Sequence, residues 1–191
     1  MTTEAISAHH HVFDTALGPC GVAWNERGLT AVQLPEKDRA STERRLAAKA
    51  ASTGAVEPPP AIAAVVADIQ RYLAGEAVDF AAASVDLSGL DPFRQKLYET
   101  MRALDWGETT TYGALAKKLG ATGWEGARDV GEAMGRNPVP VVIPCHRVLA
   151  AGGKLGGFSA HGGAATKAKL LALEGVRLPD KDRRAPRLPG L

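Results

Sequence analysis

A short apolar run near residue 140, interrupted by prolines, places the tightest constraint on how this chain folds. The prolines are Pro138, Pro140 and Pro144. Because proline lacks an N–H and fixes its own φ, no regular helix can run through this segment. The β-branched residues 141–143 predict a short buried strand, and Cys145, His146 and Arg147 follow at its end. Burying three such polar groups is costly unless they have a function, which makes Cys145 a candidate nucleophile.

Composition restricts the classes of protein to which the chain can belong. It has 191 residues, 45% of them hydrophobic, which is enough for one domain or two small ones. The net charge of +2 gives no strong basic bias, although a local patch is sufficient to bind phosphate. The N-terminus is polar, and no apolar run reaches membrane-spanning length. We therefore expect a cytoplasmic protein whose two cysteines, Cys20 and Cys145, stay reduced.

The first part of the chain, residues 1–88, predicts a small α/β unit. Alternating apolar residues and turn signals predict strands at 11–16, 20–24, 29–34 and 80–87. Helix-favouring composition and apolar spacing predict helices at 38–51 and 61–73, with a proline-rich linker between them. No catalytic cluster is evident in this unit.

The second part, residues 89–177, predicts a mostly helical domain. Apolar residues at helical spacing predict helices at 92–104, 112–119, 127–136 and 165–174. A loop is expected over 123–126, and Thr110 or Thr111 is expected to cap the second helix. The second and third helices are compatible both with a helix-turn-helix and with an ordinary helical hairpin, and the pattern leaves both open.

Two further segments are expected to lack regular secondary structure. Six glycines between residues 150 and 163 predict a loop that moves or approaches another group closely. The basic, proline-containing residues 178–191 predict a partly disordered tail.

Several runs in the second part together resemble the O6-alkylguanine-DNA alkyltransferases. The principal runs are RDVGEAMGRNP at 128–138 and PCHRV at 144–148. The supporting runs are WGETTTYG at 106–113, GFS at 157–159 and LLALEG at 170–175. The likeness is close over residues 91–176, whereas the first unit is similar only in its layout of strands and turns.

Membership of this family implies a suicide DNA-repair protein. Such a protein flips an alkylated guanine out of the duplex and transfers the alkyl group irreversibly to its own cysteine. The implied partner is double-stranded DNA carrying O6-alkylguanine, with O4-alkylthymine left open as a second substrate. We expect a monomer that needs no cofactor, no metal and no membrane. The implied fold is an RNase H-like α/β domain followed by a helix-turn-helix domain whose recognition helix enters the minor groove.

The resemblance also assigns roles to residues of this chain. Cys145 is the acceptor thiol, activated through a water by His146, which Glu174 orients. Asn137 ties the end of the recognition helix to the cysteine segment, and the hydroxyl of Tyr112 protonates the departing guanine. The residues expected at the DNA or the flipped base are Arg128, Met134, Arg147, Phe158, Ser159 and Lys167.

Alternative interpretations remain open for the sequence by itself. The residues alone do not decide between a nucleophile and an inert buried cysteine at position 145. A lesion sensor that transfers nothing is the alternative function, against which Cys145 argues; a cysteine hydrolase would take its base from elsewhere in the sequence. Asp129 and Glu132 bring two carboxylates into the presumed recognition helix, where they oppose phosphate. The histidines 9–11 and Cys20 are poorly spaced for zinc, so no metal site is predicted.

Overall fold

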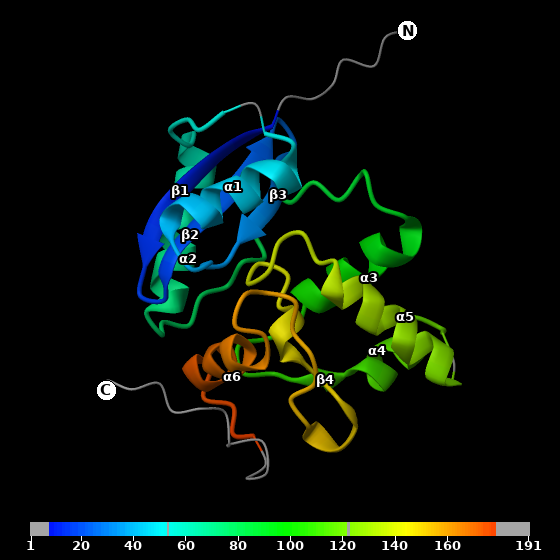
Figure 1. The fold of residues 1–191 in the computed structure, drawn as a ribbon. Helices are drawn as coiled ribbons and strands as arrows, with labels where there is room; N and C mark the ends of the chain where they lie inside the picture. Colours follow the sequence, from blue (N-terminus) through cyan, green and yellow to red (C-terminus); the bar gives the residue numbers. More distant parts are fainter. Residues whose placement is uncertain (1–7, 53, 122, 179–191) are drawn as a thin grey trace, which may run out of the picture. The chain divides into compact units, whose positions relative to one another are not determined.

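The computed structural model describes residues 8–52, 54–121 and 123–178, which divide into two compact units (Figure 1). The first unit is Met1–Asp91 together with Pro138–Val142, and the second is Pro92–Asn137 together with Ile143–Leu191. The return of residues 138–142 to the first unit has no counterpart in the sequence pattern. The predicted tail, residues 178–191, lies outside the described residues except for its first residue.

The first unit is built on an antiparallel sheet of three strands in the order β1-β2-β3. The strands are β1 His9–Thr15, β2 Gly18–Asn25 and β3 Gly28–Gln33, which confirms the three strands predicted there. The tight turn into β3 requires glycine, since Gly28 has φ +136° and a Cβ there would lie 2.5 Å from the carbonyl oxygen of Ser84. The edge of β3 is extended by residue 138, whose carbonyl accepts from the N–H of Val32 at 2.9 Å.

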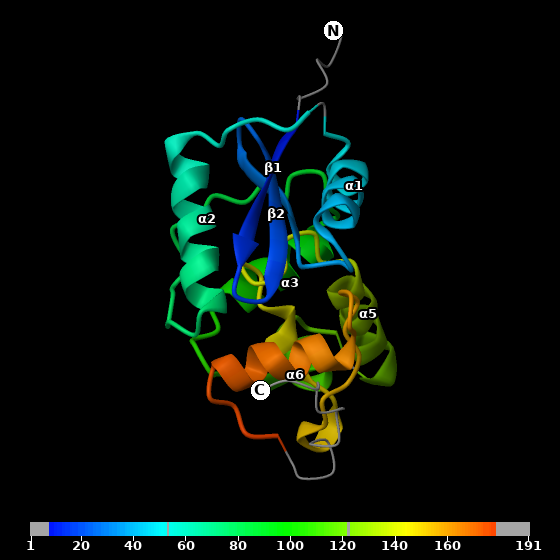
Figure 2. The same cartoon turned by 60° about the vertical axis from the view of Figure 1, so that its left-hand side comes forward.

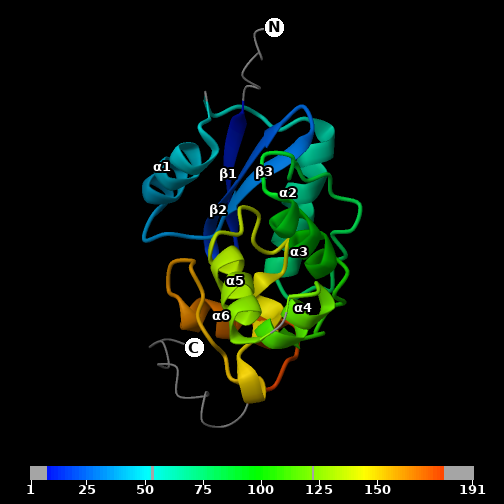
Figure 3. The ribbon, with the colours of Figure 1, turned by 90° about the vertical axis from the view of Figure 1, so that its right-hand side faces the viewer.

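Two helices cover opposite faces of this sheet, as Figures 2 and 3 show. They are α1 Arg39–Ala50 and α2 Pro60–Leu73, close to the predicted bounds. Asp38 caps α1 by accepting a hydrogen bond from the N–H of Ser41 at 2.7 Å. Gly21 of β2 lies under α1 and leaves room for its Leu46 side chain, because a Cβ at Gly21 would lie 2.5 Å from that side chain. With both faces covered, residues 20–24 of the central strand are nearly all fully buried.

The predicted fourth strand at 80–87 is wrong. This segment forms a turn at 81–83 and pairs with the sheet only through one isolated bridge, Leu29 to Val85. Its alanines favour a strand weakly. The segment is held instead by side-chain bonds to Asp86, which accepts from Asn25 Nδ2 at 2.7 Å and from Arg27 Nε at 3.1 Å.

The second unit is mostly helical, as predicted. Its helices are α3 Pro92–Arg102, α4 Tyr112–Lys118, α5 Gly123–Gly135 and α6 Ala164–Leu173. Thr111 caps α4 by accepting from the N–H of Ala114 at 3.2 Å. The expected loop at 123–126 is wrong, because α5 already includes these residues. Gly126 serves close packing, since a Cβ there would lie 2.9 Å from the Cβ of Ala121 and 3.2 Å from that of Ala116 on α4.

The cysteine segment differs from the predicted strand. Residues 141–143 are buried as expected, but residues 141 and 142 lie in a turn, in which Val141 has φ 76°, and Ile143 takes part only in a single β-bridge. The flanking prolines explain the difference, because a proline cannot donate a ladder hydrogen bond. Cys145–Arg147 then form one 3-10 turn, η1. No helix among the described residues is long and apolar enough to cross a membrane.

A very short parallel pairing, which the sequence did not predict, organises the second unit. Strands β4 Thr110–Thr111 and β5 Val148–Leu149 pair in register. Two residues are too few to give a periodic signal. The pairing matters because α4 begins directly after β4, and η1 ends directly before β5.

Candidate active site around Cys145

A pocket of about 290 Å³ in the second unit has Cys145 in its wall. The lining comes from α4, α5, η1 and the glycine loop, and consists of Tyr112, Gly131, Met134, Gly135, Cys145, Gly157, Phe158 and Ser159. The β4–β5 pair brings Tyr112, the first residue of α4, to the cysteine turn. Cys145 is 6% exposed and forms part of the wall of this pocket.

The neighbouring imidazole is held by a buried carboxylate. His146 is fully buried, and its Nε2 lies 2.8 Å from Oε1 of Glu174, the residue that ends α6. Burial lowers the pKa of His146 below its ordinary value, and this outweighs the opposing effect of the Glu174 carboxylate. The ring is therefore neutral at pH 7. With Nε2–H donating to Glu174, its lone pair is on Nδ1, which is the nitrogen able to accept a proton.

The structure gives Arg147 a different position from the one expected of a DNA contact. Its Nε donates to both carboxylate oxygens of Glu174, at 2.9 and 3.1 Å, and Nη2 donates to Oε1 at 2.9 Å. Nη1 donates to the carbonyl of Leu104 at 2.7 Å. With a 5% exposed side chain engaged in this way, Arg147 neutralises the buried carboxylate and does not line the pocket.

Glu174 has one further partner that the sequence analysis missed. The N–H of Gly107 donates to its second oxygen, Oε2, at 3.1 Å, and the backbone at Gly107 has φ +74°. A glycine in the run 106–113 was the only signal for this contact. The carboxylate thus accepts hydrogen bonds from three residues that are distant from it in the sequence. These bonds fix the position of the carboxylate and, through it, that of the His146 ring.

Asn137 is hydrogen-bonded to the cysteine segment. It is 7% exposed, and its Nδ2 donates to the carbonyl of Ile143 at 2.8 Å. This bond joins the end of α5 to the residues immediately before Cys145. The helix end and the thiol therefore keep a fixed spacing across the intervening turn.

Two ionisable side chains lie near the thiol. Lys167 is fully buried, and its Nζ donates to the carbonyls of Val148 at 2.6 Å and Gly157 at 3.2 Å. Burial lowers the pKa of Lys167 to about 8, with the charge of Cys145 acting in the opposite direction. Burial, and then the charge of Cys145, raise the pKa of Tyr112 above its ordinary value, so its hydroxyl keeps its proton at neutral pH. The Lys167 ammonium also lies 5.8 Å from the Tyr112 ring centroid.

The remaining predicted residues divide into two groups. Met134, Phe158 and Ser159 line the pocket, whereas Arg128 lies on the exposed surface of α5. Asp129 is also on this surface, with one carboxylate oxygen 3.7 Å from the Arg128 guanidinium. The lining glycines at 131 and 135 were not singled out from the sequence, because a glycine carries no functional group to indicate a site, whereas Gly157 belongs to the predicted glycine loop.

The arrangement can support displacement by sulfur. A thiol faces a small pocket, a neutral base that is fixed by a carboxylate follows it in the chain, and a protonated phenol stands opposite. An ammonium nearby favours the thiolate over the thiol. A flat molecule that enters the pocket would meet apolar walls at Met134 and Phe158 and a hydroxyl at Ser159.

Comparison with known proteins matches both units. The family model "6-O-methylguanine DNA methyltransferase, DNA binding domain" matches residues 92–176, and the model "6-O-methylguanine DNA methyltransferase, ribonuclease-like domain" matches residues 8–87. The methylated-DNA–protein-cysteine methyltransferase of Mycobacterium bovis is 34% identical over 171 residues, which cover 90% of this chain and 94% of the relative.

Two further matches concern DNA. A DNA base-flipping protein of Thermus thermophilus is 42% identical over 108 residues, which cover 56% of this chain and 69% of that protein. The crystal structure of Mycobacterium tuberculosis OGT in complex with DNA matches with a TM-score of 0.67 and 34% identity, over 87% of this chain and 93% of that chain.

Proposed function

The chain belongs to the 6-O-methylguanine DNA methyltransferase family, and on this premise we propose that Cys145 is the residue through which it repairs DNA. The protein is a methylated-DNA–protein-cysteine S-methyltransferase that acts once, on its own thiol. The substrate is a guanine alkylated at O6 within double-stranded DNA. One thiol is consumed for each lesion, because the thioether that forms has no route back to a thiol.

The observation that carries this proposal is the joint position of Cys145 and the His146–Glu174 pair. The thiol is part of the wall of a pocket, while the imidazole beside it in the chain is buried and hydrogen-bonded to a carboxylate at 2.8 Å. A base in a fixed orientation next to a nucleophile is the arrangement that activates a thiol.

The transfer is a displacement at the alkyl carbon. Nδ1 of His146 takes the thiol proton through a bridging water, and the Lys167 ammonium stabilises the resulting thiolate. Sulfur then forms a bond to the alkyl carbon as the bond from that carbon to O6 breaks. The electron pair remains on guanine, and the hydroxyl of Tyr112 supplies a proton to a ring nitrogen. Tyr112 regains its proton from solvent after the guanine has left.

The DNA reaches this pocket by base flipping, with α4 and α5 acting as a helix-turn-helix. The tight packing of these helices at Gly126 and the pocket-lining residues of α5 support this assignment. Recognition helix α5 lies in the minor groove, and Arg128 takes the place of the extruded base. The first unit takes an RNase H-like fold, a proposal supported by its helix-covered sheet and by the match to the ribonuclease-like domain of the family. A DNA-containing compartment that keeps thiols reduced, such as the cytoplasm, suits both free cysteines.

Intact mass spectrometry tests this function. The protein is mixed with an excess of duplex that carries one O6-methylguanine, and its mass is followed to completion. We expect a gain of one methylene equivalent that maps to Cys145, with one lesion repaired per protein. An unchanged mass with retained duplex binding would contradict transfer and would make the protein a lesion sensor. A parallel duplex with O4-methylthymine shows whether the pocket also accepts that base.

The pH dependence of transfer follows from the burial of His146. Because its pKa lies below 6.5, we expect the single-turnover rate to persist as pH falls from 8 to 6.5 and to decline only below that value. The rate decreases towards low pH because a protonated imidazole cannot take the thiol proton. In the unfolded chain, His146 takes up a proton near pH 6.5, whereas in the folded chain it does so only at lower pH. The free energy of unfolding therefore also decreases as pH falls below 6.5. Rates are measured by quench-flow with the free base O6-benzylguanine, which excludes effects on DNA binding. A loss of rate on acidification whose midpoint lies above pH 6.5 would contradict the assignment of His146 as the base.

A further inference from the structure

Helix α5 carries an unusually exposed tryptophan at its start. Trp124 is 71% exposed, and the other exposed large hydrophobic residue among those described is Val56 at 42%. Trp124 lies in the first turn of α5. A single exposed apolar residue is ordinary on a protein surface, so its meaning depends on the helix face that carries it.

That face is the one that lines the Cys145 pocket. Residues 7 or 11 positions apart in an α-helix lie about two or three turns apart on the same side. Trp124 therefore shares a side with Gly131 and Gly135, both of which line the pocket. The two glycines present no side chain, so a ligand can approach this part of the helix closely. Indole and pocket belong to one continuous surface of α5.

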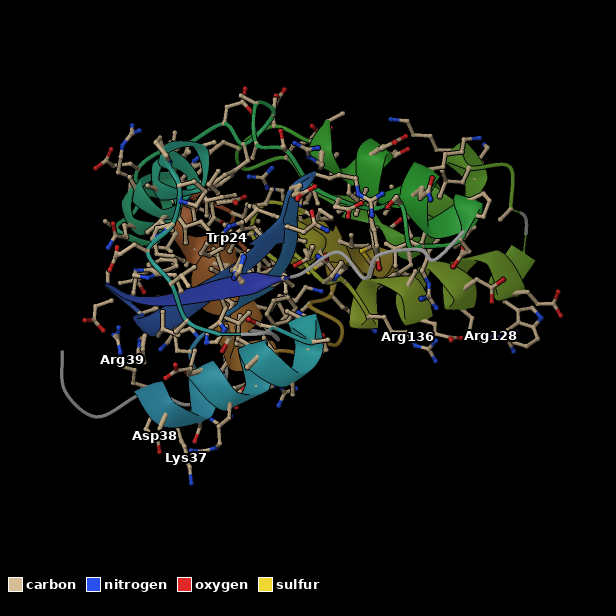
Figure 4. The ribbon with its side chains drawn as sticks, turned by 90° about the horizontal axis from the view of Figure 1, so that it is seen from above. Trp24, Lys37, Asp38, Arg39, Arg128 and Arg136 are labelled. Carbon is tan, nitrogen blue, oxygen red and sulfur yellow. The ribbon has the colours of Figure 1, made fainter. Side chains whose placement is uncertain are left out.

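The carboxylate of Glu132 lies beside this surface and not within it. Around the helix, Glu132 is displaced by about 100° from Gly131 and by about 60° from Gly135, on the side opposite to Met134. Its Oε1 forms an ion pair with Nη2 of Arg136 at 2.9 Å. Figure 4 shows the Arg136 and Arg128 side chains projecting outward from α5. Arg136 thus compensates the charge of Glu132, which stands beside the strip formed by Trp124, Gly131 and Gly135.

Trp124 also holds the arginine that follows it by one helical turn. The guanidinium carbon of Arg128 lies 5.1 Å from the centroid of the Trp124 ring, at the i,i+4 spacing that brings such side chains together. Nη2 of Arg128 is 3.7 Å from Asp129. In the structure, Arg128 is thus stacked on the indole and extends along the helix.

We propose that Trp124 is a DNA contact that anchors the minor groove beside the lesion and keeps Arg128 positioned for entry into the duplex. This inference rests on the proposed function. Seven helical residues span about 10 Å, or about three base-pair steps, so the indole contacts DNA about three steps from the flipped nucleotide. There its flat apolar face packs against sugars and base edges, as apolar side chains do in minor-groove proteins. Arg128 leaves the ring when DNA covers it.

The variants Trp124→Ala and Trp124→Phe test this contact, with Val56→Ala as the matched control. Affinity for an undamaged duplex and the rate of Cys145 alkylation from lesion-bearing duplex are measured for each variant. Reaction with the free base O6-benzylguanine, which needs no duplex, reports on the pocket alone. We expect Trp124→Ala to weaken duplex binding about tenfold, while the free-base rate is unchanged. Trp124→Phe retains a flat ring and stays within about threefold of the wild type, and Val56→Ala equals it.

Intrinsic fluorescence provides a direct readout, because of the three tryptophans Trp24 is buried and Trp106 half-buried, whereas Trp124 is exposed. Adding duplex should change the emission of the wild type far more than that of Trp124→Phe. Duplex affinity of Trp124→Ala within twofold of the wild type would overturn the contact and leave the proposed function intact. Loss of the free-base reaction in Trp124→Ala would also overturn the proposed DNA contact, since Trp124 would then act through the pocket. Failure of the wild type to be alkylated by either substrate would instead contradict the proposed function itself.

Discussion

Cys145→Ala is expected to abolish alkyl transfer completely while leaving duplex binding intact. The substitution removes the thiol, the strongest nucleophile in the pocket wall, and it changes little else in a residue that is 6% exposed. Extrusion of the base depends on α5 and the pocket, which remain. We therefore expect lesion-bearing duplex to stay bound without reaction. The measurement is transfer from a radiolabelled methyl group, together with a binding titration on the same duplex.

The matched control is Cys20→Ala, which removes the other cysteine. Cys20 is fully buried in β2, and burial raises its pKa to about 12, so it cannot supply a thiolate at neutral pH. This variant should still transfer one alkyl group per protein, with a loss of stability of about 1 kcal/mol for the small cavity. Label that persists on Cys145→Ala protein would show that another residue is the acceptor.

Glu174→Gln is expected to reduce both stability and reactivity. The amide keeps the shape of the side chain but removes its charge, which leaves the guanidinium of Arg147 buried without a counter-ion. Removing one partner of a buried ion pair costs about 3 kcal/mol, to be measured as the free energy of unfolding in urea. His146 loses its charged hydrogen-bond partner at the same time. We expect the single-turnover rate to fall about 100-fold, the scale of one general base.

Glu132→Gln is the control for this variant. Glu132 also forms an ion pair with an arginine, Arg136, but both side chains are more than half exposed. The change should alter the free energy of unfolding by less than about 0.5 kcal/mol. A similarly small change for Glu174→Gln would mean that the buried carboxylate does not stabilise Arg147. Rates are compared at a temperature at which each variant is folded, which separates reactivity from stability.

Elements with a local signal were predictable from the sequence. The three strands of the first unit and the helices of both units follow from alternation, apolar spacing and capping residues, each visible within a few neighbouring positions. The predictions that failed had the same local basis. Residues 80–87 and 141–143 look like strands, but a strand also requires a partner with free donors and acceptors. Residues 80–87 pair with the sheet at one bridge, Leu29 to Val85, and the prolines around residue 140 lack the N–H that a ladder needs.

The sequence by itself determined which residues could carry the chemistry, because the thiol, its neighbouring imidazole and the runs around them are contiguous. Only the tertiary structure decided how they are used. Glu174 reaches His146 across 28 residues and Gly107 across 67, and Arg147 donates to this same carboxylate from the cysteine turn. Such contacts carry no periodic signal, because they depend on which surfaces meet when helices and strands pack. The burial of a charged group, and therefore the pKa of His146, exists only after that packing is complete.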